Sequence, residues 1–156
     1  MNILGIDPGK DGALVLLSDY KFRDALQMPI EYLLPKKRMP RIDIATIKQW
    51  LDSISFDAVY LERVQLRTMG HKATLTTASN YDALWRIFQH SGLVEVPVAT
   101  WQKYTRSMMG DTTGKKPKDL AFKYCKSVGF DAGEDDGVAD AFCIASYGYS
   151  LQEFGA

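Results

Sequence analysis

Cysteine is scarce in this sequence, which has only Cys125 and Cys143 among its 156 residues. Their spacing matches neither a paired metal-binding motif nor a disulfide framework, so it argues against a cysteine zinc site and favours a reducing compartment. Net charge is also lacking, because 19 lysines and arginines balance 19 aspartates and glutamates. Any polyanionic partner must therefore be met by local basic patches, since the whole molecule offers no attractive field.

Long hydrophobic runs are missing as well. No apolar stretch reaches the length needed to cross a membrane, and the N-terminus lacks the basic flank and cleavage site of a signal peptide. We therefore expect a soluble, cytoplasmic protein with no membrane partner. The chain does have 46% hydrophobic residues, enough to bury the core of one ordinary domain, and we expect a single domain over residues 1–156.

The opening residues form a short apolar run that ends in a carboxylate. Residues 2–6 predict a buried strand, Asp7 stands at its end, and Pro8-Gly9 predicts a turn. Residues 12–17 and 22–28 predict two further strands that continue an antiparallel arrangement. An aspartate before proline is also common in turns, and a solvated one needs no chemistry, so Asp7 alone decides nothing.

A second apolar run ends in a carboxylate in the same way. Residues 56–63 predict a fourth strand that carries Glu62 near its end, and Asp43 can cap a helix over residues 44–54 before it. A helical crossover makes the fourth strand parallel to the first. Asp7 and Glu62 are then expected side by side at the sheet edge where open α/β sheets bind their ligands.

The remaining chain alternates loops with helices around one more strand. Residues 70–77 are expected to loop before a helix that ends near His90, and residues 93–98 predict a fifth strand at an edge, where Pro97 is tolerated. The basic segments 35–41 and 109–117 predict loops. Further helices are expected over residues 100–108, with Thr100 as cap, 118–128 and 138–151. The helix that ends near His90 has an apolar stripe, which is expected to pack into the core or, where it is exposed, to form a dimer contact. The stripe consists of Ala78, Tyr81, Trp85 and Phe88.

The last predicted helix carries two acids four residues apart. Asp136 and Asp140 share one helix face if the helix already includes Asp136, and Cys143 and Ile144 around Asp140 are not residues of a solvated surface. Burying an unpaired carboxylate costs on the order of several kcal/mol or forces protonation, a cost that a metal ion would remove. Asp135 is expected to cap the helix, although either Asp135 or Asp136 could complete a metal site.

Two strand ends and one helix thus supply an all-oxygen set of candidate catalytic and metal-binding residues. Its members are Asp7, Glu62, Asp136 and Asp140. Hard oxygen ligands suit Mg²⁺ or Mn²⁺. Two such ions about 3.5–4 Å apart can clamp the attacking water and the leaving oxygen of a phosphodiester, which would give the set a function.

Three segments resemble those of a known family. Ile3–Gly9, Val59–Val64 and Asp136–Ala141 are similar to the motifs of the RuvC-type Holliday junction resolvases of the ribonuclease H-like superfamily, particularly their phage-borne and prophage-borne relatives. The resemblance implies an α/β fold with a five-stranded mixed sheet, its first three strands antiparallel and the rest parallel, flanked by helices. It also implies a homodimer that resolves branched DNA by paired, Mg²⁺-dependent nicks, with two Mg²⁺ ions per site and Mn²⁺ as a substitute.

The resemblance includes one departure. Cellular RuvC enzymes usually place the two ligands of the last helix three residues apart, but position 137 is glycine here. The four-residue spacing of the phage-like relatives implies that Asp136 is the partner of Asp140. On this pattern Asp7 would bridge both ions, and Glu62 and Asp140 would each hold one.

Basic residues supply candidate phosphate contacts. Lys103 and Lys118 rank first, because they lie where the resolvase family carries basic residues near the scissile strand, and residues 67–77 could insert at the junction centre. His71 lacks a neighbouring partner that would mark it as a catalytic base. The candidates are Lys10, Arg63, Arg67, His71, Lys72, Lys103, Arg106, Lys115, Lys116 and Lys118.

Other functions remain open at this point. A nuclease of the same superfamily could act on RNA or on other branched DNA. A nucleotide-binding module of the actin or sugar-kinase type uses a similar hairpin, but it needs two such domains and this chain has room for one. A junction-binding protein without catalysis would retain four acids in an apolar setting at a cost and without a function.

Overall fold

The computed structural model describes residues 1–32, 39–65, 70–110 and 117–155, and its main sheet has five strands. These strands are β1 (Asn2–Ile6), β2 (Ala13–Ser18), β3 (Lys21–Gln27), β6 (Ala58–Arg63) and β7 (Leu93–Pro97). They lie in the order β3-β2-β1-β6-β7, with β1 antiparallel to β2 and parallel to β6. The predicted mixed sheet is therefore confirmed, including the edge position of the strand that contains Pro97.

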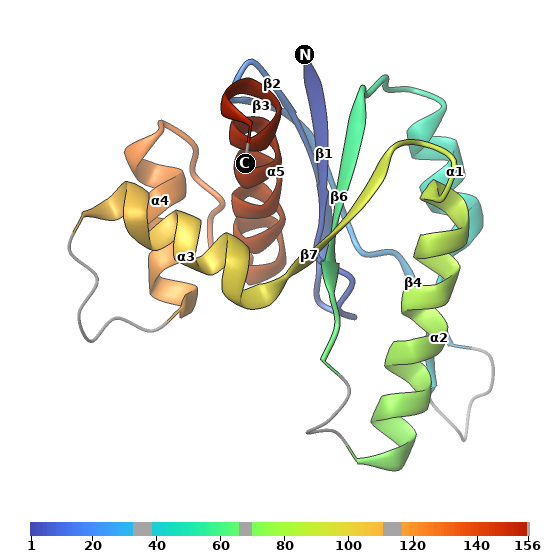
Figure 1. The fold of residues 1–156 in the computed structure, drawn as a ribbon. Coiled ribbons are helices and arrows are strands. Elements are labelled where there is room, and N and C mark those ends of the chain that lie inside the picture. Colours follow the sequence, from blue (N-terminus) through green and yellow to red (C-terminus); the bar gives the residue numbers. More distant parts are fainter. Residues whose placement is uncertain (33–38, 66–69, 111–116, 156) are drawn as a thin grey trace.

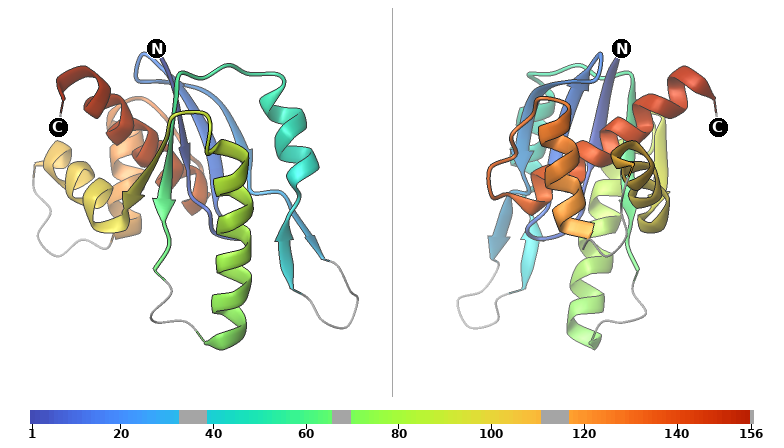
Figure 2. Two further views of the ribbon diagram at one scale, coloured as in Figure 1. Left: turned by 45° about the vertical axis from the view of Figure 1, so that its right-hand side comes forward. Right: turned by 90° about the vertical axis from the view of Figure 1, so that its left-hand side faces the viewer.

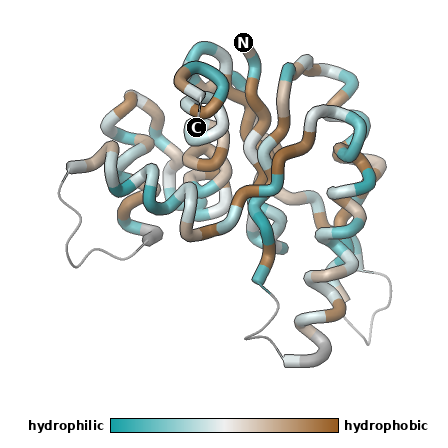
Figure 3. Tube along the Cα trace, in the orientation of Figure 1, coloured by the Kyte–Doolittle hydropathy of each residue, from teal (hydrophilic) through white to brown (hydrophobic). Residues whose placement is uncertain are grey.

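Helices cover both faces of this sheet (Figure 1). One face carries α1 (Ile44–Leu51) and α2 (His71–Phe88), and the other carries α3 (Val98–Met109), α4 (Pro117–Ser127) and α5 (Asp136–Phe154). Strand β1 serves both layers, because its side chains alternate between the faces. Ile3 packs into the core beneath α5, whereas Leu4 and Ile6 pack into the core beneath α1 and α2. Hydrophobic residues accordingly dominate the central strands in Figure 3.

Helix α5 lies unusually close to β1, and Gly5 makes this possible. A Cβ atom on residue 5 would stand 2.3 Å from the carbonyl oxygen of Ala141, where no side chain fits. Both cysteines are fully buried in the core on this side. The close packing of α5 on β1 fixes where the first turn of α5 lies relative to the end of β1.

Helix α2 begins earlier than the sequence suggested. The backbone N–H of Thr74 donates to the carbonyl oxygen of Gly70 at 2.9 Å, so the helix starts at His71 and the predicted loop over 70–77 is wrong. Threonine has a low helix propensity, but burial of Leu84 and Phe88 anchors the helix, which extends back from them. Trp85, assigned to the same buried stripe, is 38% exposed, because the core-facing stripe runs through Leu84 instead.

A second, two-stranded sheet was not expected from the sequence. Strands β4 (Ile30–Tyr32) and β5 (Pro40–Ile42) pair antiparallel, and β5 occupies the end of the segment predicted as a basic loop. Asn80 of α2 holds β5 through its side chain, which donates to the Pro40 carbonyl at 3.1 Å and accepts from the Ile42 N–H at 3.3 Å. Figure 2 shows the hairpin extending beside α2 beyond the main sheet.

The ends of three helices also differ from the expectations. Helix α3 begins at Val98, so Thr100 is not its cap, and α1 ends at Leu51. Helix α5 begins at Asp136, and Asp135 is its cap, since its Oδ1 accepts a hydrogen bond from the Val138 N–H at 2.9 Å. In the described part of the chain, no helix has the length and apolarity needed to span a membrane.

Candidate active site

The first two acids come from neighbouring parallel strands. Ile6 of β1 is paired in register with Leu61 of β6, so the residues that follow, Asp7 and Glu62, lie side by side at the carboxyl ends of their strands. Asp7 is held by the turn after β1, where its Oδ1 accepts the N–H of Gly9 at 3.0 Å. The predicted juxtaposition of the two acids is confirmed by this pairing.

The other two acids come from the first two turns of α5. This end of the helix lies against the turn after β1, where Gly137 and Gly12 form an isolated parallel bridge. A Cβ atom on residue 137 would stand 2.2 Å from the carbonyl oxygen of Asp11, so no side chain can occupy that position. The acid that precedes Asp140 on this helix face therefore cannot lie at 137, and the four-residue spacing to Asp136 follows from the packing.

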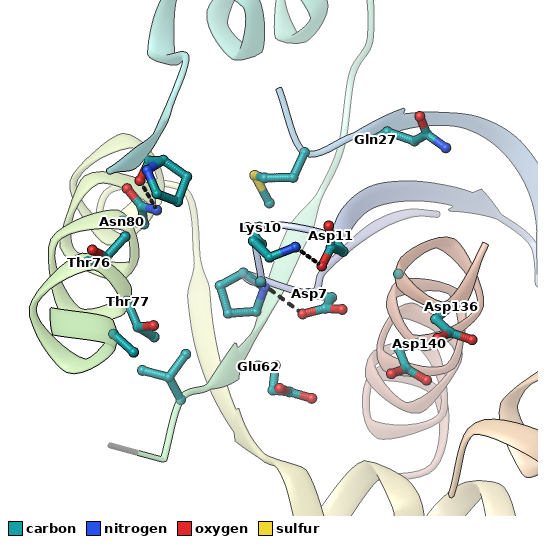
Figure 4. Close-up of a pocket in the computed structure, with 18 of the residues that line it drawn as sticks. Asp7, Lys10, Asp11, Gln27, Glu62, Thr76, Thr77, Asn80, Asp136 and Asp140 are labelled. Carbon is teal, nitrogen blue, oxygen red and sulfur yellow. Dashed lines mark hydrogen bonds and ion pairs between the residues drawn. The ribbon is translucent and has the colours of Figure 1, made fainter. Parts of the chain in front are cut away.

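One cleft brings the predicted set together. Asp7, Glu62, Asp136 and Asp140 all line a cleft of about 1310 Å³, and Figure 4 shows Asp7 and Glu62 at the strand ends on one side and Asp136 and Asp140 on α5 beside them. The opposite wall is built from uncharged residues of α2 and the β4–β5 hairpin, namely Met39, Pro40, Ala73, Thr76, Thr77 and Asn80. Among the residues that the structure describes, the cleft thus has one acidic wall and one uncharged wall.

One acid of the acidic wall, Glu62, has a shifted pKa. Burial, and after it the negative charge of Asp7, raise the pKa of the Glu62 carboxyl to about 7, while a hydrogen bond from Trp101 acts in the opposite direction. The indole N–H of Trp101 donates to Oε2 of Glu62 at 2.8 Å. Sequence reasoning did not find this contact, because the two residues are 39 positions apart and no motif links them.

The donor chemistry of this wall fits a hard divalent cation. All four side chains offer carboxylate oxygens, and burial and the nearby charge of Asp7, which raise the pKa of the Glu62 carboxyl, disfavour the anionic form that a bound cation would stabilise. Within the described ranges, no three His, Cys, Asp or Glu side chains lie close enough together to hold a metal ion, so the protein alone does not form a closed cage of ligands. Mg²⁺ rarely uses such cages, since it keeps several waters and combines one or two carboxylates with substrate phosphates.

Asp135 and Asp136 have different surroundings. Both oxygens of Asp135 accept hydrogen bonds, Oδ1 from the N–H of Val138 and Oδ2 from the side-chain amide of Gln27. Both residues line the cleft, but Asp136 occupies the first helical position and shares the helix face of Asp140. The capping function of Asp135 makes Asp136 the better candidate for the acidic set.

The basic candidates are distributed over several elements. Lys10 lines the cleft and forms an ion pair with Asp11, while Lys103 is exposed on α3 and does not line the cleft as far as the structure describes it. Arg63 and Arg106 are exposed as well. Arg67, Lys115 and Lys116 lie outside the described residues. Helical first turns contain the remaining candidates, which are His71 and Lys72 in α2 and Lys118 in α4.

Comparison with solved structures identifies the fold. A structure of RuvC from Thermus thermophilus in complex with a Holliday junction substrate matches with a TM-score of 0.64 at 16% identity, covering 99% of this chain and 96% of that chain. This chain has the RuvC fold. A second T. thermophilus RuvC structure matches with a TM-score of 0.65 at 15% identity, covering 99% of this chain and 97% of that chain.

Sequence comparisons add nothing to this likeness. No protein-family model matches the chain, and no curated protein sequence matches it significantly. The RuvC fold therefore confirms the expected fold class, whereas the phage-like branch of the resemblance stays a prediction.

Proposed function

We propose that this protein is a Mg²⁺-dependent, structure-selective endodeoxyribonuclease that resolves Holliday junctions by paired symmetric nicks. The observation that carries the proposal is the meeting of Asp7, Glu62, Asp136 and Asp140 in one cleft of a RuvC fold. One of the RuvC structures with this fold was determined with a Holliday junction substrate. A fold alone does not fix a function, so the proposal depends on the acidic wall of the cleft.

The residues of this wall would hold the metal. Asp7 and Glu62 would contribute from the strand ends, and Asp140, with Asp136, would contribute from α5. When bound, Mg²⁺ activates water as a nucleophile and stabilises negative charge on the leaving oxygen of the phosphodiester. The cleft has a volume of about 1310 Å³, and the described residues of its wall on α2 carry no negative charge that would repel a phosphate backbone.

A homodimer is part of the proposal. A two-fold symmetric protein presents two active sites to the two-fold related strands of a junction, which paired nicking requires. Helix α2 exposes Leu75 at 53% and Trp85 at 38%, and large exposed apolar side chains on one helix suit a self-association surface. We expect sedimentation velocity to give the mass of a dimer, and charged substitutions at Leu75 and Trp85 to shift it towards the monomer.

The decisive test uses a synthetic four-way junction with Mg²⁺ or with EDTA. We expect the wild type to nick the junction only with Mg²⁺, and Mn²⁺ to replace Mg²⁺. Asp7→Asn should lower the rate more than about 100-fold, because loss of outer-shell partners alone commonly costs 10–100-fold. Asp52→Asn, which makes the same change at an exposed acid after α1, should cut like the wild type.

The alternative functions predict different products. A ribonuclease of the same superfamily would prefer an RNA–DNA hybrid over the junction, and a binding protein without catalysis would retard the junction in a gel without cutting it. Equal nicking by Asp7→Asn and the wild type, or equal cutting of junction and linear duplex, would refute the proposal.

A further inference from the structure

Trp101 gives the acidic wall a neutral support. Its indole N–H can only donate hydrogen bonds, and it donates to Oε2 of Glu62 at 2.8 Å. We propose that Trp101 is a positioning residue that holds Oε2 of Glu62, so that the carboxylate directs its other oxygen, Oε1, into the cleft towards Mg²⁺. This inference rests on the proposed function, because it states which way a carboxylate of the proposed metal site points.

The topology places the indole where this role needs it. Glu62 of β6 is paired in register with Val96 of β7, and the chain turns into α3 at Val98 without a loop. The first turn of α3 therefore lies next to the carboxyl end of β6, and Trp101 belongs to that turn. The contact between Trp101 and Glu62 is a consequence of the strand register and of the immediate start of the helix.

Trp101 itself is firmly held. Its side chain is 2% exposed and is part of the core on the α5 side of the sheet. One turn further along the helix, the Thr105 hydroxyl donates to the Trp101 carbonyl oxygen at 3.0 Å, and Thr105 is buried as well. A donor on a buried ring cannot follow a moving carboxylate, so the hydrogen bond restricts the rotamers of Glu62.

A neutral donor suits this position better than a cation. A lysine or arginine beside Glu62 would pair with the carboxylate and compete with a divalent ion for its charge. The indole N–H orders the carboxylate without adding a positive charge that would compete with the metal. Such outer-shell hydrogen bonds to metal-binding side chains commonly change metal affinity by 10–100-fold when they are removed.

The chain contains a matched control for this contact. The indole N–H of Trp50 in α1 donates to Oδ2 of Asp24 in β3 at 3.0 Å, so it forms the same kind of hydrogen bond at nearly the same length. Neither Trp50 nor Asp24 lines the cleft in the described part of the protein. Replacing Trp50 by phenylalanine therefore removes the same donor without touching the proposed metal site.

The experiment compares Trp101→Phe with Trp50→Phe by calorimetric titration with Mg²⁺ and Mn²⁺ in the absence of DNA. We expect Trp101→Phe to weaken metal binding about 10-fold and Trp50→Phe to leave it unchanged. Junction binding in EDTA should be the same for both variants. Equal metal affinity of Trp101→Phe and wild type, or an equal loss in Trp50→Phe, overturns the positioning role while the nuclease proposal stands.

If Trp101→Phe does not fold, an NMR measurement on the wild-type protein tests the same inference. The sequence has three tryptophans, and their indole N–H groups give three NMR signals, which Trp50→Phe and Trp85→Phe assign by elimination. On addition of Mg²⁺ to the wild type, the Trp101 signal should move and the Trp50 signal should not. A Trp101 signal that stays in place while Mg²⁺ binds overturns the inference. A wild type that neither binds Mg²⁺ nor cuts the junction overturns it together with the proposed function.

Discussion

Gly137, at the start of α5, packs directly against Gly12 in the turn after β1. A Cβ atom on residue 137 would stand 2.6 Å from the Cα of Gly12 as well as 2.2 Å from the Asp11 carbonyl oxygen. These neighbours are backbone atoms, which cannot rotate out of the way. The same contact fixes Asp136 and Asp140 relative to Asp7, so packing and the proposed chemistry depend on a single position.

We expect Gly137→Ala to lower both stability and activity. Overpacking against backbone costs about 1–3 kcal/mol, and relief of the clash requires the first turn of α5 to move away from the cleft. The free energy of unfolding from urea titration should fall by that amount, and junction cleavage should fall at least about 10-fold. Gly70→Ala, where no atom of the described residues lies within 4 Å of an added Cβ, is the stability control. It changes only the N-cap of α2, so it should cost less stability than Gly137→Ala and leave cleavage intact. A fully stable and active Gly137→Ala would contradict the proposed packing constraint.

The raised pKa of Glu62 predicts a pH dependence of stability in the metal-free protein. Folding raises this pKa from 4.5 to about 7, so the folded state favours the protonated carboxyl. The resulting stabilisation is fully present below pH 4.5 and is lost as pH rises through about 7. It amounts to about 3 kcal/mol at most, since one unit of pKa corresponds to about 1.4 kcal/mol.

Urea unfolding in EDTA at several pH values measures this effect. The wild type should lose stability relative to Glu62→Gln between pH 5 and pH 8, because glutamine cannot ionise. Saturating Mg²⁺ should remove most of the difference in slope. Parallel pH profiles of the two proteins in EDTA would show that Glu62 titrates as an ordinary exposed carboxyl.

The sequence was sufficient for the parts of the site that follow from local pattern and chain topology. Asp7 was predicted from its position at the end of a buried strand. Glu62 was predicted to lie beside it, because two strands joined through a helix run parallel. The spacing of Asp136 and Asp140 required only helical periodicity. Each of these inferences uses either residues that are close in sequence or the helical crossover between two strands. Physical constraints allow that crossover only one common direction and handedness.

The missed features depend on contacts between distant residues. The hairpin of β4 and β5 is held by Asn80, which lies 38 residues beyond Ile42 in the chain. The start of α2 was missed because its threonines have low helix propensity, whereas burial of Leu84 and Phe88 decides the outcome. The support of Glu62 by Trp101 has no signal in the sequence, since neither residue type implies the other.

Asn80 gives a direct test of the hairpin. Its side chain is 6% exposed and makes two hydrogen bonds to β5, so Asn80→Ala leaves a buried N–H and a partly buried carbonyl without these partners. We expect a loss of about 1–3 kcal/mol in the free energy of unfolding and faster hydrogen exchange at the Ile42 amide. Asn2→Ala removes one exposed hydrogen bond to Ser55 and should cost less. Unchanged exchange at Ile42 would show that β5 does not depend on α2.

Of the basic candidates in the described part of the chain, Lys10 is the one that lines the cleft itself. It follows the turn that carries Asp7, and its ion pair with Asp11 is exposed, so a DNA phosphate can compete for the ammonium group. Lys10→Gln should weaken junction binding in EDTA and lower the slope of log affinity against log salt by about 1, the value for one lost phosphate contact.

The same measurement on Lys103→Gln tests the family-based expectation for that residue. Lys48→Gln, at an exposed position of α1, makes the same change of charge and should leave the slope unchanged. Equal slopes for all four proteins would mean that DNA approaches the acidic wall without contacting either lysine.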